Sequence, residues 1–153
     1  MEKYITKFLQ YGTLLSTLAL IGSVALQIFA RFFLANTPPW TEEASRLFFI
    51  YATSFAAGLA FKEQYYVHLD LFFDKMSAGV QKLVLVLIPL LILILFGLMA
   101  AYTIPFIIRG QAELAPSMNL QMSLAFGSMF ILAASIAYYA CLMLIEKLKS
   151  PQS

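Results

Sequence analysis

Four long apolar runs dominate this chain and limit what it can fold into. They predict spans over about residues 8–30, 41–61, 83–108 and 120–145. The hydrocarbon core of a bilayer is roughly 30 Å thick, so a helix that rises about 1.5 Å per residue crosses it with about 20 apolar residues. Hydrophobic residues make up 61% of the chain and charged residues 12%, whereas soluble domains average about 45–50% and 25%. The sequence therefore predicts an all-α integral membrane protein, one domain over residues 1–153 with four transmembrane helices.

The basic residues divide by type between the two ends of these spans. One side holds Lys3, Lys7, Lys62, Lys75, Lys82, Lys147 and Lys149, and the other holds Arg31, Arg46 and Arg109. The positive-inside rule places the lysine side in the cytoplasm, which gives an N-in/C-in topology. The planar guanidinium of arginine suits fixed carboxylate partners. We therefore expect the specific contacts on the arginine side.

A segment between the second and third spans has the pattern of a surface helix. On a helix over about residues 65–80, apolar side chains share one face and most polar and charged ones lie on the other. This pattern predicts an amphipathic helix along the cytoplasmic surface of the membrane. The alternative is that the segment begins the third span, which would carry Asp70 and Asp74 into lipid.

The charged stretch TPPWTEEASR, residues 37–46, leads into the second span and supplies its first six residues, before the apolar run at 47–61. Its prolines suit the first turn of a helix, and either threonine suits the N-cap. Starting near Thr41 gives this span enough residues to cross. Glu42 stands four residues before Arg46, so we expect Arg46 to be paired, either with Glu42 or with an acid on a neighbouring helix. For Glu43 we expect ordinary capping at the solvated surface.

The spans carry none of the residues that intramembrane chemistry requires. Their central parts contain no Asp, Glu, Lys, Arg or His, although a carrier that acts alone usually places such a residue there. One cysteine excludes an internal disulfide. Cys141 is expected to be a small apolar filler, and His68 an interfacial polar residue rather than a metal ligand. We predict no enzymatic activity, no metal or cofactor in this chain and no nucleic-acid binding.

Small residues recur at helical spacing in the second and fourth spans. The second carries Ala52, Ala56, Ala60 and Gly58, and the fourth carries Ser123 with Gly127 and Ala133 with Ala137. Such spacing lets helices approach closely. It serves either packing within this chain or docking on a larger membrane protein.

Several motifs in order resemble the DctQ-type small subunit of tripartite ATP-independent periplasmic (TRAP) transporters. They are Arg31 after the first span, WTEEASR at residues 40–46, FAAGLAF at 55–61, HLDLF at 68–72 and a third span that contains proline. One departure is the fourth span, which lacks the proline that the resemblance leads us to expect. The resemblance implies a multi-pass protein of the bacterial inner membrane that scaffolds a large permease subunit. That partner would hold the sodium and substrate sites, and a periplasmic binding protein would deliver an organic acid such as a sialic acid.

The resemblance also implies roles for particular residues. The residues expected to contact partners on the periplasmic side are Arg31, Trp40, Glu42, Glu43, Arg46 and Arg109. Those expected to pack on the large subunit are Ala52, Ala56, Gly58 and Ala60, and those expected in the cytoplasmic interface helix are His68, Asp70, Phe72 and Phe73. Membrane lipid is the remaining expected partner. The alternative function is a carrier or channel that acts alone as a homo-oligomer.

Overall fold

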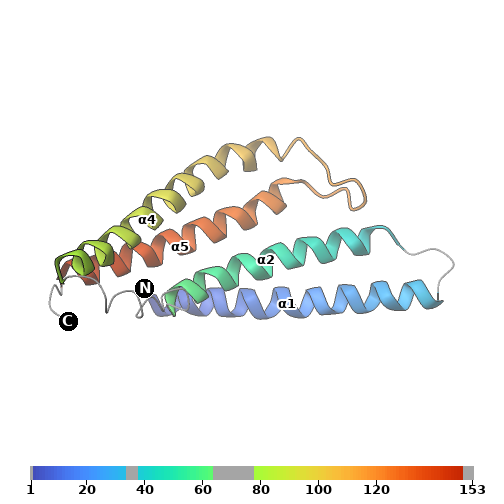
Figure 1. Ribbon diagram of the computed structural model, residues 1–153. Coiled ribbons are helices and arrows are strands. Elements are labelled where there is room, and N and C mark those ends of the chain that lie inside the picture. The colour runs from blue at the N-terminus through green and yellow to red at the C-terminus, as the bar shows by residue number, and fades with distance from the viewer. Residues whose placement is uncertain (1, 34–37, 64–77, 150–153) are drawn as a thin grey trace.

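The computed structural model describes residues 2–33, 38–63 and 78–149. Over these ranges the chain forms four α-helices, each long and apolar enough to cross a membrane. They are α1 (Glu2–Phe33), α2 (Trp40–Lys62), α4 (Ala78–Arg109) and α5 (Ser123–Lys149). The predicted all-helical fold with four spans is confirmed, and Figure 1 shows the helices running side by side.

The first helix begins six residues before the predicted span. Its first turn carries Glu2, where the helix dipole favours an anion, and the Thr6 hydroxyl donates to the Glu2 carbonyl at 3.0 Å. A helix also continues wherever its backbone hydrogen bonds can form, not only where its side chains are apolar. Hydrophobicity alone therefore gave a span that was too short.

The second helix matches its predicted span to within one residue at each end. Its N-cap is Pro39, which makes no side-chain cap, so the expectation that Thr41 caps this helix is wrong. Thr41 lies inside the first turn instead, and its hydroxyl donates back to the Pro38 carbonyl at 2.8 Å. The other candidate cap, Thr37, lies outside the described residues.

The third span begins earlier than predicted and includes Pro89 and Pro105. Because α4 starts at Ala78, residues 78–80 belong to this span and not to the surface helix predicted over residues 65–80. The rest of that prediction, including His68, Asp70, Phe72 and Phe73, lies outside the described residues.

The fourth helix starts at Ser123, three residues after the predicted start, and runs four residues past the predicted end. The preceding residues are not helical because they pair across a turn. The Ala115 amide donates to the Leu120 carbonyl at 2.7 Å, and the Met122 amide donates to the Glu113 carbonyl at 2.9 Å.

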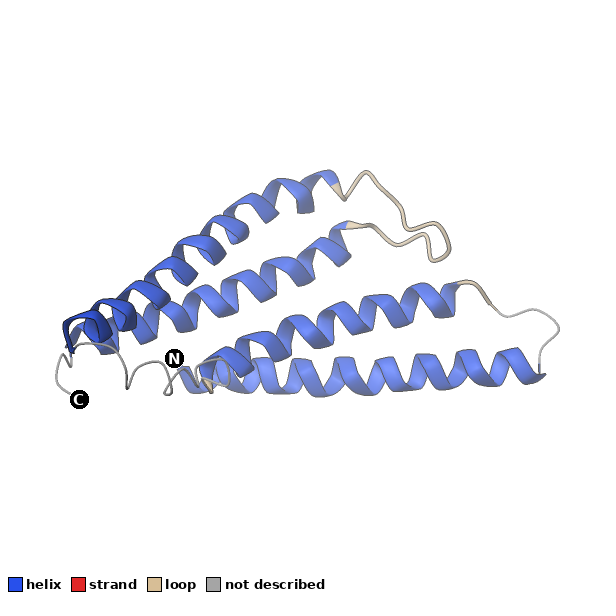
Figure 2. Cartoon of the chain, viewed as in Figure 1, coloured by secondary structure: helices blue, strands red, loops and turns tan. Residues whose placement is uncertain are grey.

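The helices are arranged as a row in the order α1, α2, α5, α4. Helix α2 packs against both α1 and α5, and α5 packs against both α2 and α4. Figure 2 shows the same row as two hairpins laid side by side. The outer helices α1 and α4 consequently bury little of their surface inside this chain.

The core lies where the middle helices meet α1. Leu9 of α1, Phe55 of α2 and Tyr139 of α5 form a buried cluster. Gly12 permits the approach of α1 to α2, because a Cβ there would lie 2.7 Å from a ring carbon of Phe55. Gly58 serves the contact between α2 and α5 in the same way. The small residues of α2 therefore serve packing against α1 and α5 within this chain.

Two of the residues that we expected on the large subunit are buried inside this chain. Ala52 is 8% exposed, and Gly58 faces Ser135 and Leu9. Ala56 and Ala60 are half-buried, so part of their surface remains outside the row. Contact of these residues with a large subunit stays a prediction.

Candidate functional site

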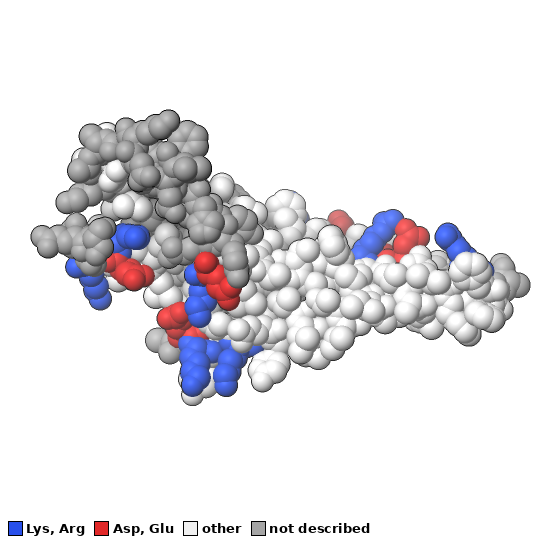
Figure 3. Space-filling view, turned by 60° about the horizontal axis from the view of Figure 1, so that its bottom comes forward, with Lys and Arg blue, Asp and Glu red and all other residues white. Residues whose placement is uncertain are grey.

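Charged side chains gather at the two ends of the row. Figure 3 shows blue and red residues at both ends of the visible face and an uncharged surface between them. We call the end with the chain termini the lysine end and the opposite end the arginine end. Arg31 lies in the last turn of α1, Arg46 in the second turn of α2 and Arg109 in the last turn of α4, and all three are exposed. The described basic residues thus separate by type, as the sequence predicted.

Arg46 is paired as predicted. One of its guanidinium nitrogens lies 2.5 Å from a carboxylate oxygen of Glu42, one helical turn earlier. The two side chains are 77% and 60% exposed, so the pair stabilises the helix by less than about 1 kcal/mol. Trp40, just before this pair, is also exposed.

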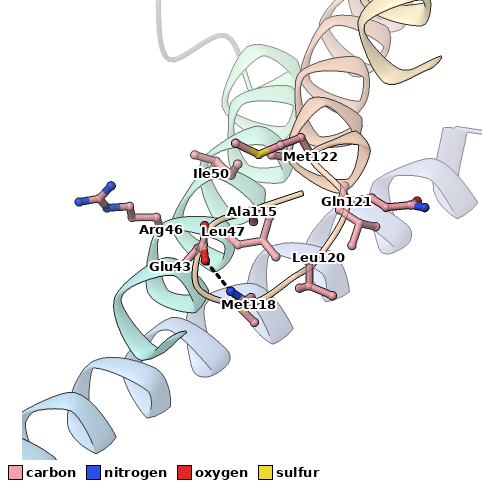
Figure 4. Close-up of a pocket in the computed structure, with 11 residues that line it drawn as sticks. Glu43, Arg46, Leu47, Ile50, Ala115, Met118, Leu120, Gln121 and Met122 are labelled. Atoms are coloured by element: carbon pink, nitrogen blue, oxygen red, sulfur yellow. Dashed lines mark hydrogen bonds between the residues drawn. The ribbon is translucent and has the colours of Figure 1, made fainter. Parts of the chain in front are cut away.

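Glu43 differs from its neighbour and from our expectation of ordinary capping. One of its carboxylate oxygens accepts hydrogen bonds from two successive backbone amides, Ser117 at 2.9 Å and Met118 at 2.8 Å. These residues lie 74 and 75 positions further along the chain. Figure 4 shows the Glu43 side chain directed at the loop before α5. Successive amides form a concave anion site, and hydrogen bonds to an ionised acceptor are stronger than neutral ones.

The partner of Glu43 is an ordered loop, residues 110–122, between α4 and α5. Leu114 and Gln121 pair across it, and the Asn119 amide donates to the Ala115 carbonyl at 3.1 Å. Asn119 has a φ of 52°, a left-handed conformation that asparagine tolerates well. The sequence LAPSMN, with Pro and Asn three residues apart, is typical of such a turn.

The base of this loop is closed by a tight contact. The Ser123 amide donates to the Gly110 carbonyl at 3.1 Å. A Cβ on Gly110 would lie 2.7 Å from the Ser123 nitrogen, so a side chain at this position would force the two helix ends apart. The loop is therefore fixed at its base by Gly110 and near its tip by Glu43.

A second hydrogen bond joins α2 to the start of α5. The Tyr51 hydroxyl donates to the Leu124 carbonyl at 2.7 Å. Gly127 lies beneath this hydroxyl, and a Cβ there would approach the Tyr51 oxygen to 3.3 Å. Together with Glu43, Tyr51 ties the two hairpins together at the arginine end.

A pocket of about 220 Å³ opens between α2 and the loop. Its lining is Glu43, Arg46, Leu47, Ile50, Ala115, Met118, Leu120, Gln121, Met122, Leu124 and Ala125. Most of these side chains are apolar, and in Figure 4 the guanidinium of Arg46 points away from the loop. The Glu43 carboxylate is already bonded to the loop, so the pocket offers mainly apolar surface.

The lysine end holds a polar network that sequence reasoning missed. The Lys62 ammonium lies 3.3 Å from the Glu2 carboxylate and donates to the Thr6 hydroxyl at 3.0 Å. The Thr6 hydroxyl also lies 3.0 Å from the phenol oxygen of Tyr139, which is buried. This network links α1, α2 and α5, so Lys62 makes specific contacts at the lysine end, although we expected such contacts on the arginine side.

The other predicted site residues do not join the contacts of Glu42, Glu43 and Arg46. Among the hydrogen bonds and ion pairs of the described residues, none joins Arg31 or Arg109 to Glu42, Glu43 or Arg46. No three His, Cys, Asp or Glu side chains in the described part lie close enough together to hold a metal ion. Cys141 is a half-buried free cysteine within α5.

The four helices are long and apolar enough to cross a membrane, and their charged residues lie near the helix ends. These features define a small multi-pass membrane protein. Comparison with known families gives the particular kind. Residues 20–150 match the family model described as tripartite ATP-independent periplasmic transporters, DctQ component, and the chain belongs to this family. It is 23% identical over 147 residues to a Haemophilus influenzae protein named as a TRAP transporter small permease protein, which covers 96% of this chain and 89% of the relative.

Proposed function

We propose that this chain scaffolds the large permease subunit of a TRAP transporter in the bacterial inner membrane. Membership of the DctQ family makes it a small permease subunit of a tripartite transporter. In the proposed complex, the large subunit holds the sodium and substrate sites, and this chain widens its contact with the membrane. The arginine end faces the periplasm, with both termini in the cytoplasm.

The main support for this proposal is the exposed apolar surface of the outer helices α1 and α4. Large apolar side chains are exposed along α1 from Phe8 to Phe33 and along α4 from Leu83 to Ile108. A row of helices open on both faces offers a large subunit more surface than a closed bundle does. The uncharged centres of the spans fit the same role, because the ion and substrate pathway then belongs to the partner.

The transported compound is an organic acid, and overall likeness favours a sialic acid. A periplasmic binding protein delivers it to the arginine end. There Arg31, Trp40, Glu42, Glu43, Arg46 and Arg109 form the proposed periplasmic side of the subunit. Sodium coupling, in this proposal, needs no residue of this chain.

Affinity capture tests the scaffold role. Tagged chain is co-expressed with the large permease subunit and extracted in mild detergent, and a tagged four-helix membrane protein of another family serves as control. We expect the large subunit to be retained in stoichiometric amount by this chain and not by the control. Failure of retention would contradict the proposal, and substrate flux through the purified chain alone would favour the homo-oligomeric carrier instead.

A further inference from the structure

We propose that Glu43 is a positioning residue that presents the 110–122 loop as the docking element for the periplasmic binding protein. This inference rests on the proposed function, because it needs a binding protein that arrives at the arginine end. It goes further in naming one loop and the side chain that fixes it.

Hydrogen bonds within the loop set its conformation but do not fix its position relative to α2. Its internal hydrogen bonds, from Ala115 to Leu120 and from Met122 to Glu113, set its fold. None of these bonds reaches α2. The described contact that ties the loop backbone to α2 by hydrogen bonds is the Glu43 carboxylate on the amides of Ser117 and Met118.

The strength of this attachment depends on the acceptor being a carboxylate. An ionised oxygen accepts two converging amide donors more strongly than a neutral oxygen does. Glu43 is half-buried, so water competes less for it than for the exposed Glu42. One side chain in the first turn of α2 therefore holds the tip of a loop that begins at the end of α4.

The outer surface of the loop suits a protein partner. Leu114 is 59% exposed, and Pro116, Ser117 and Gln121 are exposed beside it. An apolar side chain surrounded by polar groups is a common arrangement in protein interfaces. The loop projects past the ends of α4 and α5 at the arginine end and lies beside the first turn of α2 (Figure 1), which is the side that faces the periplasm in the proposed orientation.

Fixing the loop lowers the entropic cost of docking. A loop that is already held in its bound position loses less freedom when a partner arrives. If the tip is released, only a fraction of molecules present the loop correctly, and the apparent affinity falls by that fraction. Glu43 therefore acts on affinity for the binding protein and not on the transport step.

The test uses the whole transporter in proteoliposomes, with the binding protein titrated from outside. Uptake is measured for wild type, Glu43→Gln, Glu43→Ala and the control Glu63→Gln, which removes the same charge at an exposed position at the lysine end, away from the loop. We expect Glu43→Ala to raise the half-saturating concentration of binding protein about tenfold, a change in affinity equivalent to about 1.4 kcal/mol. The maximal rate should stay within about twofold. Glu43→Gln should raise the half-saturating concentration less than Glu43→Ala does, and Glu63→Gln should leave it unchanged.

Amide hydrogen exchange at Ser117 and Met118 provides the second readout. Faster exchange in Glu43→Ala together with the raised half-saturating concentration would support the inference. A freed loop with unchanged half-saturation would overturn it, as would an increase in Glu63→Gln equal to that in Glu43→Gln. An assembly defect in Glu43→Ala leaves Glu43→Gln to decide by the same two readouts. Wild-type uptake that does not respond to binding protein would instead overturn the proposed function.

Discussion

Gly58 and Ser135 touch across the centre of the row, where α2 meets α5. A Cβ placed on Gly58 would lie 2.5 Å from the Ser135 hydroxyl oxygen and 2.7 Å from its Cβ. Serine is too short to move aside, so the two helices would have to separate. Glycine at this position sets the distance between the two hairpins.

Gly58→Ala should therefore destabilise the isolated chain. We expect the free energy of unfolding in detergent micelles to fall by about 1–3 kcal/mol, the usual cost of overpacking. Gly97→Ala is the matched control, because nothing lies within 4 Å of a Cβ there. That substitution should leave stability unchanged or raise it by up to about 1 kcal/mol, since alanine favours helix. Equal effects of the two changes would contradict the packing.

Tyr51→Phe removes the hydroxyl that joins α2 to the Leu124 carbonyl. We expect a loss of about 1 kcal/mol in the free energy of unfolding, the typical net value of one hydrogen bond. Tyr102→Phe, at a side chain that is 67% exposed, is the control and should change stability little. If both variants unfold at the same temperature as wild type, the hydroxyl does not tie the hairpins together.

Lys62→Met tests the network at the lysine end. The change leaves the Thr6 and Tyr139 hydroxyls bonded to each other but removes the cation that faces Glu2. We expect stability to fall by about 1 kcal/mol, whereas Lys3→Met, at an exposed position, should stay within about 0.5 kcal/mol of wild type. A larger effect at Lys3 would show that general charge, and not this network, matters.

Arg46→Ala should lower transport without removing the protein from the membrane. Because Glu42 and Arg46 form an exposed pair, their coupling in a double-mutant cycle should be no more than about 1 kcal/mol. The double variant should accordingly do less damage to uptake than the two single losses summed. Strictly additive losses would mean that the ion pair has no role in transport.

Topology is tested by thiol labelling after the native Cys141 is replaced by alanine. Cysteine introduced at Gln111 lies at the arginine end, and cysteine at Lys3 lies at the lysine end, both at exposed positions. A membrane-impermeant reagent should label the first in intact cells and the second only after permeabilisation. The opposite pattern would invert the proposed orientation.

The sequence predicted what depends on local pattern. The span Trp40–Lys62 was found to within one residue because apolar length and first-turn chemistry lie in one stretch. The pair of Glu42 with Arg46 followed from helical spacing alone. The segregation of lysine from arginine likewise needed no tertiary information.

The sequence did not predict the contacts between segments that lie far apart in the chain. Glu43 meets amides 74 and 75 residues away, and those amides converge only because a turn forms at residues 115–119. Nothing near Glu43 in the sequence indicates a partner in the loop before α5. Likewise, the Lys62 ammonium donates to the Thr6 hydroxyl. This contact exists because α1 begins in polar sequence, before the span that hydrophobicity predicted. Pairing at this range depends on how the helices are arranged in the row.

The most direct test of the scaffold role is substrate uptake by proteoliposomes of defined composition. They would contain this chain alone, the large permease subunit alone, or both, each with the periplasmic binding protein and a sodium gradient. We expect uptake only when both membrane subunits are present, and none from this chain alone. Uptake by this chain alone, or full uptake by the large subunit without it, would contradict the scaffold role.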